Sequence, residues 1–146
     1  MEGSNTFAQR LSARVRETGE TRFAVDIWVG GHLLKGDLPA PDSAKGIGPA
    51  PHEMLLASLG ECTAMTVRWY AQRHFYPLEA VNVDLTYRKG SLEGREGTID
   101  VFTKAVQLTG PALTQEQRAR LIDVAAKCPI QRLLEGVPVI TTAEDR

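Results

Sequence analysis

Two cysteines, Cys62 and Cys128, are the residues of this chain whose side chains can do chemistry together. A thiolate that attacks a peroxide becomes a sulfenic acid, and a nearby second thiol condenses with it to a disulfide that prevents further oxidation. That reaction requires two sulfurs that are close in space, and the sequence leaves their distance open. No CxxC motif and no Cys/His cluster at zinc spacing is present. A zinc site made of both cysteines and His52 is an alternative that no local ligand spacing supports.

Cys62 lies in the apolar stretch from Pro51 to Phe75. A cysteine inside an apolar helix most often acts as a small core hydrophobe. Burial among apolar groups also raises the pKa of a thiol, which works against nucleophilicity. A reactive Cys62 therefore needs a cation or a hydrogen-bond donor from elsewhere in the fold.

Cys128 has a more polar setting, because it follows Lys127, precedes Pro129 and stands close before Arg132. If Pro129 is the first residue of a short helix, Cys128 is its N-cap, where amide dipoles and nearby cations favour the thiolate. A capped, partly buried thiol without any catalytic role explains the same residues equally well. Both interpretations stay open at this point.

The stretch around Cys62 predicts a long central helix. Its apolar residues cover most of a helical surface rather than one stripe, which is typical of a helix buried nearly all round. Pro49 and Pro51 mark its start, since proline suits a first helical turn. Glu61 and Arg68 interrupt the apolar run well short of the ~20 residues that a membrane span requires.

Alternating apolar and polar residues predict strands on both sides of that helix. A β-meander is expected first, with Gly30-Gly31 as a hairpin turn, and its strands lie at 7–16, 22–29 and 32–34. After the helix we expect strands at 81–88 and 98–108, a further helical turn at 130–134, and a last strand at 137–142.

A second amphipathic helix is predicted from a capping box that runs from Thr114 to Gln117. The residues expected on its buried side are Leu121, Ile122, Val124 and Ala125. Because strands and helices do not alternate regularly as βαβ units, the order predicts an α+β fold. Neither a linker nor an internal repeat is found, so a single domain over residues 1–146 is expected.

The overall composition narrows the classes of partner. Seventeen Lys and Arg residues against eighteen Asp and Glu residues give a net charge of −1, which indicates no nucleic-acid and no membrane partner. The N-terminus has no apolar secretory segment, so a cytoplasmic protein with reduced thiols or a catalytic cysteine pair is expected. There is no GxGxxG motif, Walker loop or HExxH motif, and we therefore expect no metal and no nucleotide cofactor.

Three segments of the sequence resemble the OsmC/Ohr family of thiol-dependent hydroperoxide reductases, and its OsmC-like branch in particular. They are GIGPAPHEMLLASLGECTAMTVRWYAQR, PLEAVNVDLTYR and LTQEQRARLIDVAAKCPIQRLLEG. The resemblance runs from about Leu11 to Thr142. It implies an intertwined homodimer in which the long central helices pack back to back and the active sites lie at the dimer interface.

By that resemblance Cys62 would be the peroxidatic thiol and Cys128 the resolving thiol. The family also uses an arginine from the N-terminal hairpin, which keeps the attacking sulfur ionised, and Arg22 in TGETR is the candidate. A glutamate near the start of the central helix holds that arginine, but its position, ten residues before the first cysteine, is His52 here. Glu53 follows, rotated by roughly 100° on a helix. Neutral His52 cannot pair with an arginine as a carboxylate does.

The resemblance thus implies a peroxidase that reduces organic hydroperoxides, an antioxidant enzyme of the oxidative stress response. Apolar surroundings of the thiol would favour alkyl or lipid hydroperoxides over hydrogen peroxide. Lipoyl-type dithiols are the reductants that the family implies, so an external dithiol is the expected partner. The alternative is a dimeric binding protein of the same fold, which holds an apolar small molecule and whose cysteines are not catalytic. His52 at the carboxylate position favours this alternative.

Overall fold

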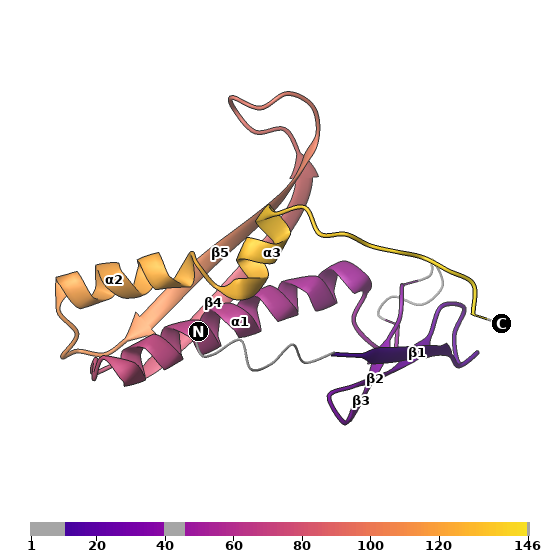
Figure 1. Cartoon of the computed structure of the whole chain (residues 1–146), viewed down its shortest axis with the longest axis horizontal. Helices are drawn as coiled ribbons and strands as arrows, with labels where there is room; N and C mark the ends of the chain where they lie inside the picture. Colours follow the sequence, from indigo (N-terminus) through magenta and orange to yellow (C-terminus); the bar gives the residue numbers. More distant parts are fainter. Residues whose placement is uncertain (1–10, 40–45, 146) are drawn as a thin grey trace. The chain divides into compact units, whose positions relative to one another are not determined.

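The computed structural model describes residues 11–39 and 46–145. The chain forms two compact units, Met1–Leu55 and Leu56–Arg146, and Figure 1 shows the helices and strands of both. The α+β class is confirmed, because strands and helices are both present without βαβ alternation. The single domain over residues 1–146 stays a prediction.

The first unit contains a three-stranded antiparallel meander with the strand order β1-β2-β3. The strands are β1 (Ala13–Glu17), β2 (Val25–Val29) and β3 (His32–Gly36). Gly30 and Gly31 have φ angles of 57° and 78°, which are the left-handed conformations that a tight hairpin turn requires. The predicted meander and its turn are therefore confirmed. Residues 7–10 of the first predicted strand lie outside the described residues.

Buried Asp37 fastens the chain after β3 within the first unit. Its carboxylate accepts hydrogen bonds from the hydroxyl of Thr21 at 2.9 Å and from the N–H of Leu38 at 2.7 Å. A third bond comes from the N–H of Ile47 at 3.0 Å. These bonds hold the turn before β2 and the loop before the first helix at one carboxylate.

The helix α1 (Pro51–Arg73) begins at the predicted proline. One Glu53 oxygen accepts a hydrogen bond from the N–H of Ala50 at 3.0 Å, as the glutamate of a capping box does. Phe75 follows the helix with a φ of 56°, a left-handed conformation that no helix continues.

Burial of α1 is one-sided. The buried residues recur three and four positions apart, and they are Leu59, Gly60, Thr63, Thr66, Val67 and Ala71. Met65 is 60% exposed and Trp69 is 38% exposed. The prediction of a helix buried nearly all round is therefore wrong, because packing in the second unit covers only one face of α1.

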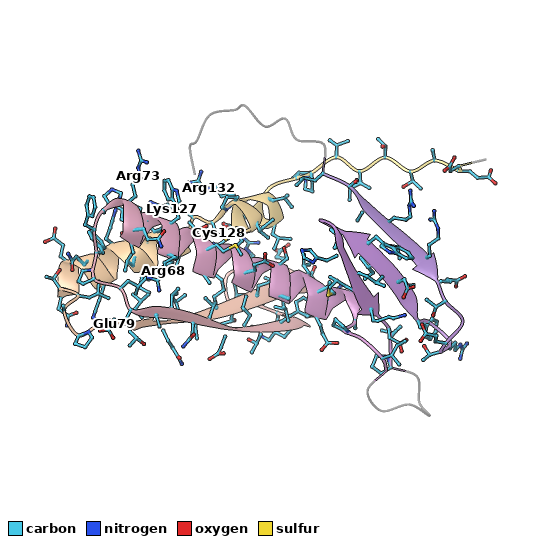
Figure 2. The ribbon with its side chains drawn as sticks, turned by 90° about the horizontal axis from the view of Figure 1, so that it is seen from below. Arg68, Arg73, Glu79, Lys127, Cys128 and Arg132 are labelled. Carbon is cyan, nitrogen blue, oxygen red and sulfur yellow. The ribbon has the colours of Figure 1, made fainter. Side chains whose placement is uncertain are left out.

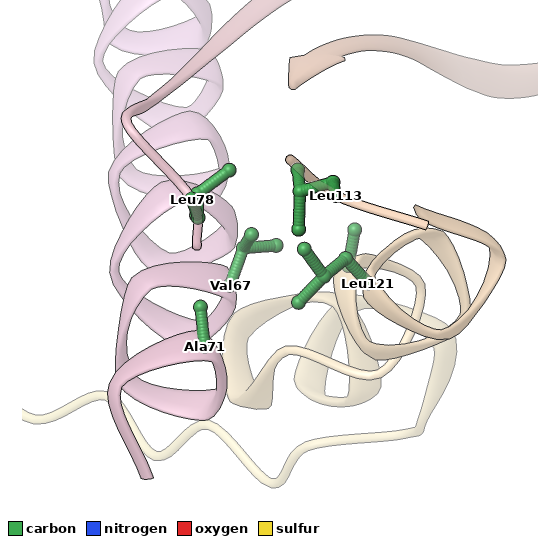
Figure 3. Packing of buried hydrophobic residues seen from close by; sticks show 6 residues of the cluster. Val67, Ala71, Leu78, Leu113 and Leu121 are labelled. Atoms are coloured by element: carbon green, nitrogen blue, oxygen red, sulfur yellow. The ribbon is translucent and has the colours of Figure 1, made fainter. Parts of the chain in front are cut away.

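The second unit is built around one hydrophobic core. Its other elements are β4 (Ala80–Gly90), β5 (Ile99–Thr109), α2 (Gln115–Ala125) and α3 (Pro129–Glu135). β4 and β5 form a long antiparallel hairpin, as predicted. Figure 3 shows the core between α1 and α2, and it consists of Val67, Ala71, Leu78, Leu113, Leu121 and Ala125.

For α2, both the start of the helix and its buried face can be compared with the prediction from the sequence. Thr114 accepts a hydrogen bond from the N–H of Gln117, and the Gln117 side chain accepts one from the N–H of Thr114, both at 3.0 Å. The predicted capping box is confirmed. Leu121 and Ala125 are buried as expected. Ile122 is 45% exposed, so its placement on the buried side is wrong; it is rotated by roughly 100° from Leu121.

Removing the cap of α2 should destabilise the protein measurably. Thr114→Ala is expected to lower the free energy of unfolding by about 1 kcal/mol, because the N–H of Gln117 loses its acceptor. Urea denaturation followed by circular dichroism measures the change. Thr141→Ala is the matched control, since Thr141 is exposed and lies outside any helix or strand. Equal losses in both variants would contradict a stabilising cap.

The last predicted strand, at 137–142, is wrong. The segment forms no helix or strand in the structure. A strand requires a neighbour for its backbone hydrogen bonds, and no strand among residues 11–39 and 46–145 pairs with this segment. Its large apolar side chains are exposed: Val137 (96%), Val139 (90%) and Ile140 (84%).

None of the helices in the described part of the chain is long and apolar enough to cross a membrane.

Candidate active site

The second unit brings the two cysteines together. Cys62 is half-buried on α1, and Cys128 is fully buried before α3. Thr63, the neighbour of Cys62 in the chain, places its Oγ1 3.5 Å from the Sγ of Cys128. Each thiol influences the pKa of the other through a side-chain hydrogen bond. Both cysteines are free thiols, so the reduced pair is present in one contact cluster.

Cys128 caps α3, as the sequence predicted. Its backbone is extended at φ −65° and ψ 148°, and Pro129 occupies the first helical turn. The Sγ accepts a hydrogen bond from the N–H of Gln131 at 3.4 Å. Figure 2 shows Cys128 between α1 and the start of α3. A sulfur in this place receives donors from two elements of the fold.

Lys104 of β5 supplies a cation to the same cluster. Its Nζ donates hydrogen bonds to the Oγ1 of Thr63 at 3.0 Å and to the carbonyl of Ala125 at 2.7 Å. Burial lowers the pKa of Lys104, while the charges of Cys128, Cys62 and Glu135 act in the opposite direction. The two hydrogen bonds fix the ammonium group between α1 and the end of α2.

The environment of Cys128 favours its thiolate. Burial by itself would raise the pKa of this thiol. Hydrogen bonds from Thr63, from the N–H of Gln131 and from Cys62, together with the charge of Lys104, outweigh burial and lower the pKa. Cys128 is therefore the more acidic member of the pair.

The environment of Cys62 favours its thiol form. Burial raises the pKa of Cys62, and the negative charge of Cys128 raises it further. The N–H of Ile130 and the hydroxyl of Thr66 act in the opposite direction. Among the described residues, the buried Oγ1 of Thr66 has no well-formed hydrogen-bond partner. Lys104 also interacts by charge with Cys62, but the pKa of Cys62 is raised overall, so the described surroundings in the second unit do not favour the thiolate that a reactive cysteine needs.

The other predicted site residues lie in the first unit. Arg22 is exposed, and its guanidinium carbon lies 5.2 Å from the ring centroid of Phe23. His52 and Glu53 are exposed in the first turn of α1, where Glu53 holds the N–H of the residue before the helix. The support of Cys62 by Arg22, and the roles of His52 and Glu53, stay predictions.

Sequence reasoning missed Lys104 and Thr63. The signal for Lys104 is its register, because it takes the same side of β5 as Val106 and Leu108, which pack on the core. Because lysine is rarely buried without a polar partner, a lysine at an inward position of an amphipathic strand predicts such a partner. Thr63 has a similar signal, since it is a polar residue on the buried face of α1. Its partners come from β5 and α3, which local patterns do not reveal.

A separate groove lies on another face of α1. It has a volume of about 480 Å³ and is lined by Ala64, Met65, Arg68, Trp69, Gln72, Glu79, Ala80 and Val81. Met65 follows Thr63 by two residues, which is roughly 200° around a helix. Arg68 lines the groove and donates to the carbonyls of Leu78 at 2.8 Å and Glu79 at 3.1 Å (Figure 2). The cysteine cluster is not part of this groove.

The described residues contain no group of three or more His, Cys, Asp and Glu side chains that could hold a metal ion. The reactive groups of the cluster are thus two thiols, one hydroxyl and one ammonium group. Such a set can share a proton between the sulfurs and can close a disulfide.

Comparisons with known proteins identify the family of this chain and structures of similar fold. The family model described as OsmC-like protein matches residues 43–143. No curated protein matches the sequence. An OsmC-like protein from Mycoplasma pneumoniae has a similar structure, with a TM-score of 0.71, 17% identity, and coverage of 90% of this chain and 91% of that chain.

Two further similar structures are named for hydroperoxide resistance. The organic hydroperoxide resistance protein OsmC from Legionella pneumophila has a TM-score of 0.64 at 20% identity, covering 89% of this chain and 92% of that chain. The organic hydroperoxide resistance protein OhrB of Bacillus subtilis has a TM-score of 0.58 at 18% identity, covering 86% and 90%. At these identities the likeness shows the fold, and the family match covers most of the sequence. This chain belongs to the OsmC-like protein family.

Proposed function

We propose that this protein is a thiol-dependent peroxidase that reduces organic hydroperoxides. The observation that carries the proposal is the cluster that contains half-buried Cys62 and buried Cys128. Thr63, next to Cys62 in the chain, lies 3.5 Å from the sulfur of Cys128, and each thiol affects the pKa of the other. Family membership and the two similar proteins named for organic hydroperoxide resistance support the substrate class.

Cys62 is the sulfur that attacks, because it is the more accessible of the two thiols. Its thiolate attacks the distal peroxide oxygen, the O–O bond breaks, and the alkoxide leaves as an alcohol after taking up a proton. Cys62 is then a sulfenic acid. The Cys128 thiolate attacks its sulfur, a disulfide forms, and hydroxide leaves and is protonated to water. An external dithiol reduces the disulfide by thiol–disulfide exchange and is itself oxidised.

The remaining parts of this proposal come from the family resemblance. They are Arg22 as the cation that stabilises the Cys62 thiolate when Cys62 gives up its proton, an intertwined homodimer, a cytoplasmic location and a lipoyl-type dithiol as reductant. Either His52 or Glu53 would have to hold Arg22. The thiol form of Cys62 is favoured within the second unit. A cation next to Cys62 would lower the pKa of this thiol and so favour its thiolate.

Counting free thiols tests the peroxidase directly. One equivalent of cumene hydroperoxide is expected to remove both thiols of the reduced protein rapidly, and mass spectrometry should find an intramolecular Cys62–Cys128 disulfide. Cys62→Ser should keep its single thiol under the same conditions, because the attacking sulfur is missing. Thiols of the unaltered protein that persist for many minutes would overturn the proposed function.

A binding protein of the same fold is the second candidate. The raised pKa of Cys62 favours it, as does a groove that carries Met65 and Trp69 on its walls. This candidate predicts that the thiols survive the hydroperoxide and that an apolar fluorescent probe binds the protein. Met65→Glu should then weaken binding of the probe, because a carboxylate would face an apolar ligand.

A further inference from the structure

The accessible thiol and the acidic thiol of this pair are different residues. Cys62 is half-buried, so a peroxide can approach it, whereas Cys128 is 0% exposed. The sulfur of Cys128 nevertheless lies within hydrogen-bond distance of the Thr63 hydroxyl and of the N–H of Gln131, and Lys104 donates to that same hydroxyl. A reaction that begins at Cys62 therefore begins next to a sulfur whose surroundings favour the thiolate.

We propose that Lys104, acting through Thr63, is a positioning residue that keeps Cys128 as the ionised thiol of the reduced pair. Cys128 then accepts the proton of Cys62 when Cys62 reacts, and it serves as the ready nucleophile of the resolving step. The assignment of these two steps rests on the proposed function. The placement of the charge rests on the cluster itself.

The hydroxyl of Thr63 connects the cation to the sulfur. A hydroxyl has one proton to donate and two lone pairs that accept. One lone pair receives the Nζ–H of Lys104 at 3.0 Å. The single hydroxyl proton can point to the carbonyl of Leu59 at 2.8 Å or to the Sγ of Cys128 at 3.5 Å.

This choice responds to the protonation of Cys128. When Cys128 is a thiol, its S–H can donate to Thr63 while Thr63 donates to Leu59. When Cys128 is a thiolate, the Thr63 hydroxyl turns and donates to the sulfur. Lys104 stays bonded to Thr63 in both states and polarises the hydroxyl. The polarised hydroxyl therefore stabilises the thiolate of Cys128 more than its thiol.

Charged and titratable groups from every neighbouring element enter this balance. Cys62 acts on Cys128 from α1, Lys104 acts on both sulfurs from β5, and Glu135 acts on Lys104 from α3. The charges of Cys128, Cys62 and Glu135 favour the protonated ammonium group of Lys104, against the larger effect of burial, which lowers its pKa. Lys104 is the cation that acts on Cys128, and it is anchored independently by the carbonyl of Ala125.

The proton balance of the first turnover follows from this placement. The reduced pair begins with one thiol and one thiolate. The proton of Cys62 moves to Cys128 as the Cys62 sulfur bonds to the peroxide oxygen, and the alkoxide then takes that proton and leaves as the alcohol. Cys128 is a thiolate again and attacks the sulfenic sulfur, which releases hydroxide. One thiol, one thiolate and one hydroperoxide thus give one disulfide, one alcohol and one hydroxide.

Titration of the ultraviolet absorbance of the thiolate tests the inference without any peroxide. In the Cys62→Ser background only Cys128 contributes, and the variant that lacks both cysteines gives the blank for tyrosine ionisation. Lys104→Met is expected to move the midpoint upward by roughly one to two pH units, because a cation near the thiolate is lost. Thr63→Val should also move it upward, since the connecting hydroxyl is removed.

Conservative variants separate this role from a structural one. Thr63→Ser keeps the hydroxyl, and Lys104→Arg keeps the charge, so both should restore a low midpoint. Lys89→Met is the matched control, because Lys89 lies on β4 with a 66% exposed side chain and contacts Asp100 only at 3.9 Å. A midpoint that is unchanged in Thr63→Val and Lys104→Met would overturn the inference, as would a parent midpoint at the ordinary thiol value. If Lys104→Met fails to fold, the comparison of Thr63→Val with Thr63→Ser decides alone.

The pH dependence of oxidation separates this inference from the proposed function. With both cysteines present, the rate of thiol loss to cumene hydroperoxide should reach half its maximum at the ionisation of the pair. Lys104→Met should shift that point by the same amount as the titration. Shifted titrations in a protein that never reacts would overturn the peroxidase and retain the placement of the charge. Rapid oxidation with unshifted titrations would do the reverse.

Discussion

Leu121→Ala is expected to lower the free energy of unfolding by about 2–5 kcal/mol. Leu121 is 0% exposed in the core of the second unit, where it packs with Val67 of α1 (Figure 3). Its truncation removes buried methyl groups and leaves a cavity that the surrounding side chains fill only in part. Urea unfolding followed by circular dichroism measures this change in free energy. The slope of the free energy against urea concentration should stay the same in the variant.

Ile122→Ala is the matched control for this loss. Ile122 follows Leu121 on the same helix and is 45% exposed. Its truncation should lower the free energy of unfolding by less than about 1 kcal/mol, as is usual for a surface substitution. Equal losses in the two variants would mean that α2 presents a different face to the core.

This pair of residues also shows how far the sequence predicts the fold. The capping box at Thr114 fixed the start of α2, and the helical period identified Leu121 and Ala125 as buried. The four apolar residues Leu121, Ile122, Val124 and Ala125 could not all face one side, and the pattern alone did not reveal that Ile122 is exposed. Local rules therefore located the elements well and the edges of their buried faces less well.

The segment at 137–142 marks a different limit of prediction. Alternation describes which side chains would share a face if a strand formed. Whether a strand forms depends on a neighbour that supplies backbone hydrogen bonds, and such a neighbour is a property of the fold rather than of the segment. No strand among the described residues pairs with the segment at 137–142, and Val137 and Ile140 are exposed.

In the site, too, the features that depend on adjacent residues could be predicted, and those that depend on contacts between distant segments could not. Cys128 as an N-cap was predictable, because Pro129 follows it directly and the cap depends on adjacent residues. Lys104 was not predicted, since it reaches the sulfur from another element through Thr63. The resemblance to a family identified the two cysteines, while the relative acidity of the sulfurs came from the donors that the fold gathers around them.

Burial and charge compete at both sulfurs, and different effects win. Burial raises the pKa of each thiol when it acts alone. At Cys128 the hydrogen bonds and the cation outweigh it, whereas at Cys62 the neighbouring negative sulfur adds to it. A proton shared by two interacting thiols titrates as a property of the pair. Removing one sulfur should therefore change the ionisation of the other.

Cys128→Ser is the variant in which this coupling is expected to show most strongly. Serine is a preferred N-cap residue, so α3 should keep its start and the fold should be retained. Without a second thiol the sulfenic acid on Cys62 cannot close a disulfide. We expect sustained turnover with a dithiol to fall by roughly a hundredfold or more, and excess hydroperoxide should oxidise Cys62 onward to the sulfinic acid.

The ionisation of Cys62 should change in the same variant, with a sign that follows from the two contributions. Loss of the negative sulfur lowers the pKa of Cys62, while burial, the largest single effect, still acts to raise it. The first oxidation step should then reach half its maximal rate at a higher pH than in the unaltered protein, because it no longer follows the acidic Cys128. Trapping of the sulfenic acid with dimedone at several pH values measures this step. Unchanged turnover, or an unchanged midpoint, would show that the two sulfurs react independently.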